Sequence, residues 1–319
     1  QQKNLLRSFE NYQYIEAIES FKYNNNTPRS IIHLKQSDFN NGSVRIRVPG
    51  IYVLTENIVF NPNESNDFLP TQEQISSGLY PTNMMGPWHL GFFAAITVET
   101  DNVIIDMNGY TLEQSKKHSF QQRFYANIEL ANSPFVTKQG PSNFQGGTPY
   151  KAANNVLIYS NQNNTSYLGK SSHHGIHANV ANNVVIYNIY FKDYEVAAIA
   201  LNGTTLGVLS DIYALNTDKN VPILSTYSQA RFIRTFLKAI EAAQPNLELN
   251  SKKIGDVHKT LQDDLDYTFN KFFSTGSIPD KFADGRTNYF KNQNIGYDAN
   301  VYGIVLNVRG VVINDFFKE

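Results

Sequence analysis

Aliphatic and polar residues alternate in short segments that recur along most of the chain. Five such segments each contain an isoleucine followed two positions later by Val, Ala or Leu: "FFAAITVE" (92–99), "FYANIELA" (124–131), "HHGIHANV" (173–180), "VAAIALNG" (196–203) and "VYGIVLNV" (301–308). Alternation with a period of two predicts strands that bury one face. The residues predicted to point inward are led by Ile96, Ile128, Ile176, Ile199 and Ile304.

A second aliphatic segment follows each of these after a short turn. Examples are "NVIIDMNG" (102–109), "NVLIYS" (155–160), "VVIYNIYF" (184–191) and "GVLSDIYAL" (207–215), and the clearest spacing, from Ile176 to Ile199, is 23 residues. Strands this short cannot each close a core, so repeating units are expected to stack and to bury one continuous column of side chains. The pattern therefore predicts a parallel β-helix.

One segment supports this prediction by resemblance. "DNVIIDMNGYTLEQ" (101–114) resembles the repeat motif of right-handed parallel β-helix proteins, the pectate-lyase-like or pectin lyase-like superfamily, and the likeness covers roughly residues 44–224 and 299–319. "VPGIYVLTENIVFNPN" (48–63) and the richness in Asn and Ile also resemble uncharacterised β-helix proteins of large DNA viruses. The resemblance implies an all-β fold, a right-handed single-stranded parallel β-helix, and a superfamily of lyases, glycoside hydrolases, tailspikes and adhesins.

Two regions depart from the strand pattern. Residues 222–298 carry apolar residues at helical spacing in two stretches separated by Pro245 and ending before Gly276, which predicts an α-helical hairpin inserted between strands. Residues 1–43 have a weaker helical stripe and predict an N-terminal helical cap and entry loop over an open sheet edge. The expected organisation is thus 1–43 cap, 44–221 strand repeats, 222–298 helical insertion and 299–319 final repeat.

Composition and charge exclude some classes of binding partner. Lys and Arg number 27 against 28 Asp and Glu, so there is no overall positive field to attract nucleic acid, and no apolar run is long enough for a membrane span. No cap is predicted after the last repeat, so we expect the helical insertion, another copy of the chain or a neighbouring structural protein to cover its open edge, or the sequence to be an excerpt of a longer chain. The expected location is extracellular or on a virion surface.

The outward positions supply the candidate site. If the repeats are in register, Glu129 lies beside His177, with Glu99, Asn127, Asn179 and Asn202 around them. A carboxylate next to an imidazole can perform general acid–base catalysis, can bind a ligand together with the amides, or can be an ordinary cross-strand ion pair. All three interpretations stay open at this stage.

Three further features are weaker candidates. Asp193 and Glu195, two positions apart at a turn, have the residue types of a glycosidase carboxyl pair, although many ordinary turns share them. Trp88 is a candidate sugar-stacking residue or a core residue. An aligned column of Asp106, Asn188, Asp211 and Asp315 would satisfy backbone donors at turns, or would bind Ca²⁺. We expect no other cofactor or metal.

These features favour a surface-exposed protein with a structural or glycan-binding role, similar to an adhesin or a tailspike, as a virion component. The alternative is a polysaccharide lyase or glycoside hydrolase that uses Glu129, His177, Asp193 or Glu195. Lyases of the pectate-lyase-like superfamily pair acids with an Arg or Lys base, and no basic residue aligns with an acidic cluster here, which counts against lyase activity.

Overall fold

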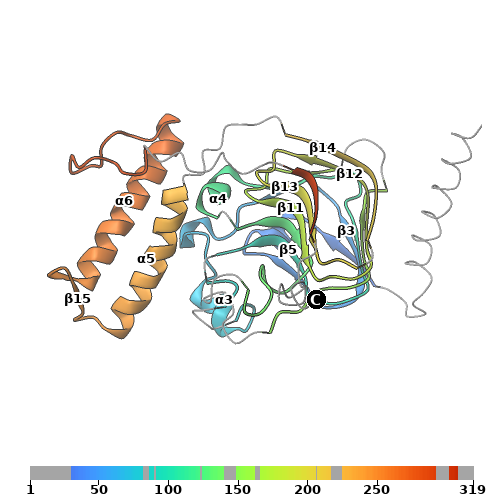
Figure 1. Cartoon of the computed structure of the whole chain (residues 1–319), viewed down its shortest axis with the longest axis horizontal. Coiled ribbons are helices and arrows are strands. Elements are labelled where there is room, and N and C mark those ends of the chain that lie inside the picture. Colours follow the sequence, from blue (N-terminus) through green and yellow to red (C-terminus); the bar gives the residue numbers. More distant parts are fainter. Residues whose placement is uncertain are drawn as a thin grey trace, which may run out of the picture.

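The computed structural model describes residues 30–81, 86–89, 91–122, 124–139, 149–161, 166–205, 207–216, 225–291 and 302–307. Two large parallel sheets dominate it (Figure 1). The six-stranded sheet contains β2 (Val44–Ile46), β5 (Ala94–Val98), β8 (Ala126–Glu129), β11 (His174–Asn179), β13 (Ala197–Asn202) and β17 (Tyr302–Asn307). The nine-stranded sheet contains β1 (Ile31–Leu34), β3 (Gly50–Leu54), β4 (Ile58–Phe60), β6 (Val103–Asp106), β7 (Leu112–Gln114), β9 (Val156–Tyr159), β10 (Tyr167–Gly169), β12 (Val184–Lys192) and β14 (Gly207–Leu215).

Helices lie between these strands along the chain. The short ones are α2 (Gln36–Phe39), a 3-10 turn η1 (Glu64–Asn66), α3 (Gln72–Ser76) and α4 (Lys116–Gln121). The long ones are α5 (Ser225–Ala243) and α6 (Ile254–Thr275), joined by a small hairpin of β15 (Glu248–Leu249) and β16 (Lys252–Lys253). Figure 1 shows α5 and α6 side by side at one end of the molecule, beyond α4.

The strands of the six-stranded sheet stand in chain order, as do β1, β3, β6, β9 and β12 of the nine-stranded sheet, whereas β10, β7 and β4 continue that sheet in reverse chain order. The chain passes from β2 to β3, from β5 to β6, from β8 to β9, from β11 to β12 and from β13 to β14, and each such pair lies in parallel against the previous one. The predicted isoleucine register is confirmed, since Ile128 pairs with Ile96 and Ile176, and Ile199 pairs with Ile176 and Ile304. Ile96, Ile128, Ile176 and Ile199 are fully buried, whereas Ile304 on the edge strand β17 is 42% exposed.

The structure corrects the expected fold class. Two large parallel sheets are combined with helices between strands, so the chain is mixed α/β and not an all-β, single-stranded parallel β-helix. The likeness to the pectate-lyase-like superfamily and to viral β-helix proteins depended on that class and is withdrawn with it. The physical reason is that period-two alternation shows only which side of a strand is buried, and a 23-residue spacing shows only that successive units pair in parallel. Neither pattern specifies the elements between the strands.

Asparagine ladders explain part of the composition. Asn102, Asn155 and Asn183 stand in the turns before β6, β9 and β12, each with a φ between 54° and 64°. Asn155 donates from Nδ2 to Asn102 Oδ1 at 3.1 Å, and Asn183 donates in the same way to Asn155 at 3.0 Å. Asparagine tolerates the left-handed backbone conformation better than most residues, and its amide both donates and accepts, so it suits a stacked turn.

The two predicted helices in 222–298 are present as α5 and α6. Their apolar faces meet α4 and the segment after α6 in a second core cluster built around Phe120, Tyr227, Leu265 and Phe290. Gly276 ends α6 with a φ of 74° and donates its N–H to Phe272 O at 2.8 Å, as a glycine cap does. The apolar residues at helical spacing in the first stretch are Phe232, Ile233, Phe236, Leu237 and Ile240. The prediction that they form one buried face is partly wrong, because Ile233 and Ile240 are 53% and 36% exposed.

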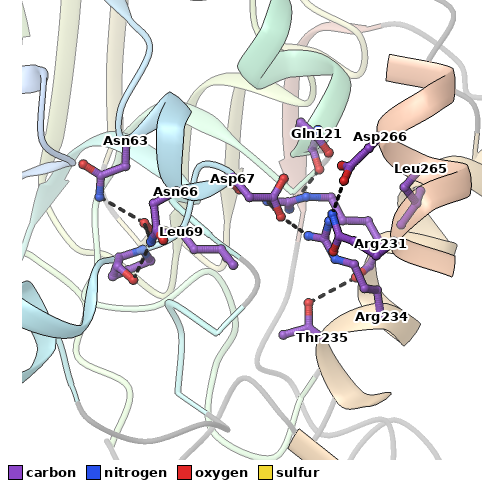
Figure 2. A network of polar contacts seen from close by, with 12 residues as sticks. Asn63, Asn66, Asp67, Leu69, Gln121, Arg231, Arg234, Thr235, Leu265 and Asp266 are labelled. Carbon is purple, nitrogen blue, oxygen red and sulfur yellow. Dashed lines mark hydrogen bonds and ion pairs between the residues drawn. The ribbon is translucent and has the colours of Figure 1, made fainter. Parts of the chain in front are cut away.

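Buried arginines attach α5 to the end of α4 and to the turn after η1 (Figure 2). Arg231, which is 4% exposed, donates from Nη1 to Gln121 O at 3.1 Å and from Nη2 to Asp67 O. Arg234 forms an ion pair with the Asp67 carboxylate. Burial lowers the pKa of Arg231, although the nearby Asp67 opposes this shift. The predicted N-terminal helix falls within residues 1–29, and most of the predicted final repeat falls beyond 307, outside the described residues.

Candidate functional site

A cavity of about 390 Å³ lies against the outer face of the six-stranded sheet. Its floor comes from outward residues of β8, β11, β13 and β17, whose inward neighbours form the isoleucine column. The walls are apolar and mostly aromatic, and include Phe93, Phe124, Phe135, Val196 and Tyr302. The polar lining residues are Glu129, His173, His174, His177 and Asn202.

The predicted pair of Glu129 and His177 lies on this floor. Register places His177 directly beside Glu129 on the neighbouring strand, and His177 Nδ1 lies 2.7 Å from Glu129 Oε2 and 2.9 Å from Oε1. Both side chains are buried, at 7% and 2% exposure of the whole residue. Burial raises the pKa of Glu129, and the contact with His177 offsets part of that rise. A carboxylate that holds one ring nitrogen of an imidazole orients the ring for proton transfer or ligand binding.

Two asparagines continue the network on the other side of His177. Asn202 Nδ2 lies 3.2 Å from His177 Nε2 and 3.1 Å from Asn179 Oδ1. Asn179 Nδ2 in turn donates to Pro134 O at 3.3 Å. Both asparagines are at least 95% buried, and both were predicted as ligand-binding residues. Asn202 lines the cavity, whereas Asn179 is not a lining residue and accepts a hydrogen bond from Asn202.

Two further histidines of the cavity were not predicted. His174 has the same parity along the strand as the inward Ile176, a position typical of the core, but it lines the cavity, and its ring stacks on that of His177, with centroids 5.0 Å apart and planes 8° apart. The ring of His173 also contacts that of His174, with centroids 4.0 Å apart. The alternation is broken at Gly175, where a Cβ would lie 2.5 Å from the ring of the core residue Phe191. Gly175 and Ile176 therefore both face inward, and a lone glycine inside a strand was the available signal.

The other predicted ligand-binding residues lie elsewhere. Glu99 forms a two-pronged ion pair with Arg45, with distances of 2.7 and 2.8 Å, and accepts a hydrogen bond from Thr97. Trp88 is 3% exposed and belongs to the core. Asn127 is fully buried and donates to Gly169 O at 3.0 Å. None of these three is among the residues that line the cavity.

The predicted carboxyl pair of Asp193 and Glu195 is also not part of the cavity lining. Both residues are half-buried, and their backbone N–H groups continue the inter-strand bonding to Leu215 O and Ser171 O, each at 3.1 Å. The structure therefore brings together two of the four residues proposed for catalysis and leaves the other two at a strand end. Their catalytic role stays a prediction.

The polar column proposed for Ca²⁺ is aligned only in part, since Asn188 and Asp211 occupy equivalent positions on β12 and β14 but Asp106 does not join them. Asp106 pairs with Tyr159 and not with the position of Asn188, and its Oδ1 accepts backbone N–H groups from Asn108 and Asn161 at 2.8 and 3.2 Å. Within the described residues, no group of three or more His, Asp or Glu side chains is arranged to hold a metal ion. Asp315 lies outside them.

Comparison with known proteins assigns no family to this arrangement. No protein-family model matches the chain, and neither a curated protein nor a solved structure was found to be similar to it. Among the described helices, none combines the length and the apolar character needed to cross a membrane.

Proposed function

We propose that the protein binds the end of a glycan in the cavity formed by Glu129, His177 and Asn202. The observation that carries the proposal is the combination of a buried polar network on the floor with aromatic side chains on the walls. Sugars present apolar ring faces and hydroxyl edges, and such a site can contact both: aromatic rings stack on the faces, while carboxylate, imidazole and amide bind hydroxyls. The volume of about 390 Å³ is within the usual range for small-molecule sites.

The charge of the lining narrows the ligand class. Glu129 is the acidic residue among the described lining residues, and these include neither Lys nor Arg. A phosphate, sulfate or uronate placed there would meet a buried carboxylate with no fixed positive charge to offset it. The favoured ligand is therefore a neutral sugar.

The test is a binding screen of neutral and acidic oligosaccharides, followed by calorimetry on any hit. Phe135→Ala removes a half-buried aromatic wall and is expected to weaken binding at least about tenfold, which corresponds to about 1.4 kcal/mol. Tyr213→Ala removes an aromatic residue that is 53% exposed and is not a lining residue, and it should leave affinity unchanged. Equal losses in both variants, or no binding to any glycan in the panel, would contradict the proposal.

The second candidate function is proton abstraction from a polysaccharide by His177, as a lyase requires. The contact between Glu129 and His177 favours it, because a carboxylate bonded to Nδ1 orients the ring with Nε2 as the base. Glycoside hydrolysis is less favoured, since it uses two carboxyl groups about 5 to 9.5 Å apart and the described lining contains only one. Incubation with uronate-containing polysaccharides, read by the absorbance of unsaturated products, tests this candidate, with Glu129→Gln and His177→Ala as the inactive controls.

The adhesin-like or tailspike-like role, the extracellular or virion location, and the self-association or neighbouring protein expected at the last strand stay predictions of the sequence.

A further inference from the structure

The hydrogen bonds behind His177 form a chain with a defined direction. It starts at the carbonyl oxygen of Pro134, which can only accept. The side-chain group of Asn179 that faces this oxygen must therefore be its Nδ2, and this leaves Asn179 Oδ1 facing Asn202. An amide oxygen accepts, so the atom of Asn202 that lies 3.1 Å away must be Nδ2.

The same Asn202 nitrogen also faces His177 Nε2, at 3.2 Å. An amide nitrogen carries two hydrogens and accepts none, so it can serve Asn179 Oδ1 with one hydrogen and His177 Nε2 with the other. That bond requires an unprotonated Nε2. If the side-chain amide of Asn202 were rotated by 180°, its Oδ1 would face Asn179 Oδ1. If the amide of Asn179 were rotated as well, Asn179 Oδ1 would face Pro134 O. Either rearrangement buries two facing acceptors.

The other ring nitrogen agrees with this assignment. His177 Nδ1 lies 2.7 and 2.9 Å from the two oxygens of Glu129, which is the geometry of an N–H donating to a carboxylate. An ionised Glu129 can only accept, so it requires the same Nδ1–H tautomer that the Asn202 side requires.

We propose that Asn202 and Asn179 are positioning residues that hold His177 as the Nδ1–H tautomer, with Nε2 as a proton acceptor beside the cavity. The assignment itself is independent of the ligand. Its consequence rests on the proposed function: a sugar hydroxyl entering the cavity would replace the Asn202 N–H as the donor to Nε2, so the site is selective for ligand groups that donate a hydrogen bond there.

The assignment is tested by long-range ¹H–¹⁵N correlation spectra of protein labelled with ¹⁵N-histidine, in which protonated and unprotonated ring nitrogens have different shifts. His177→Gln identifies the signals of His177 by their loss. In the unliganded wild type, we expect the unprotonated shift at Nε2 and the protonated shift at Nδ1. A protonated Nε2 together with an unprotonated Nδ1 would overturn the proposal.

Asn202→Asp provides the decisive variant, because an ionised carboxylate can only accept. In this variant, Nε2 is expected to become protonated. Asn250→Asp makes the same chemical change on an exposed residue of the helical hairpin and should leave the His177 signals unchanged. A wild-type pattern in a folded Asn202→Asp protein, with folding checked by circular dichroism, would also overturn the proposal. The measurement needs no glycan, so a failed binding screen and a wrong tautomer are separate outcomes.

Discussion

Gly175 offers the sharpest test of how the sheet aims its histidines into the cavity. A Cβ added at this position would lie 2.6 Å from the backbone oxygen of Ala198 and 2.5 Å from the ring of Phe191. Atoms do not approach so closely, and the Ala198 carbonyl is held in β13, so it cannot move aside as the end of a side chain can. Gly175→Ala must therefore distort β11 or separate it from β13.

The expected cost is at the upper end of the range for overpacked cores, about 3 kcal/mol. The entropy of unfolding is roughly 2 cal/mol/K per residue, so for a chain of 319 residues this corresponds to a fall in Tm of about 4 to 5 °C. The matched control is Gly303→Ala. Gly303 precedes Ile304 as Gly175 precedes Ile176, but the nearest atom to its added Cβ is 3.9 Å away.

Scanning calorimetry of both variants, with glycan binding measured alongside, checks the reasoning. We expect Gly175→Ala to melt lower and to lose binding, because His174 and His177 on either side of it change direction. If Gly175→Ala melts within 1 °C of the wild type, or if Gly303→Ala is equally destabilised, the steric argument is refuted.

Three further predictions concern other parts of the structure. Arg231→Ala should lower the free energy of unfolding by at least about 2 kcal/mol and speed amide hydrogen exchange in α5, because two backbone oxygens lose a charged donor. Its control, Lys259→Ala, removes an exposed ion pair and should cost under about 0.5 kcal/mol. Burial lowers the pKa of His118 below 6.5, so the unfolded chain binds a proton at this residue more readily than the folded protein does. The free energy of unfolding should therefore fall by up to about 1.4 kcal/mol per pH unit as the pH drops below 6.5. Denaturation measured at a series of pH values should show a smaller slope for His118→Gln than for the wild type. Asn155→Ala should be less stable in urea than Asn155→Gly by about 1 kcal/mol, since the φ of 54° penalises a Cβ; equal stabilities would contradict that reasoning.

The candidate site was predicted as far as the alternation of residues holds. Glu129 and His177 were found because each follows an inward isoleucine, and the confirmed register of those isoleucines places the two side chains together. His174 was missed because Gly175 breaks the alternation, and Glu99 was misplaced because Arg45, a residue distant in sequence, binds it. Long-range partners of this kind leave no local pattern.

The sequence by itself determined which residues pair between successive strands, because one-sided burial and a period of two allow only one register for the isoleucines, and it also determined the presence of α5 and α6. The tertiary structure decided the fold class, the attachment of the helical hairpin through Arg231 and Arg234, and the identity of the cavity residues. The reason is physical. Burial within a strand follows from neighbouring residues, whereas a cavity forms where side chains from separate strands and loops meet, and their meeting depends on the geometry of the whole chain.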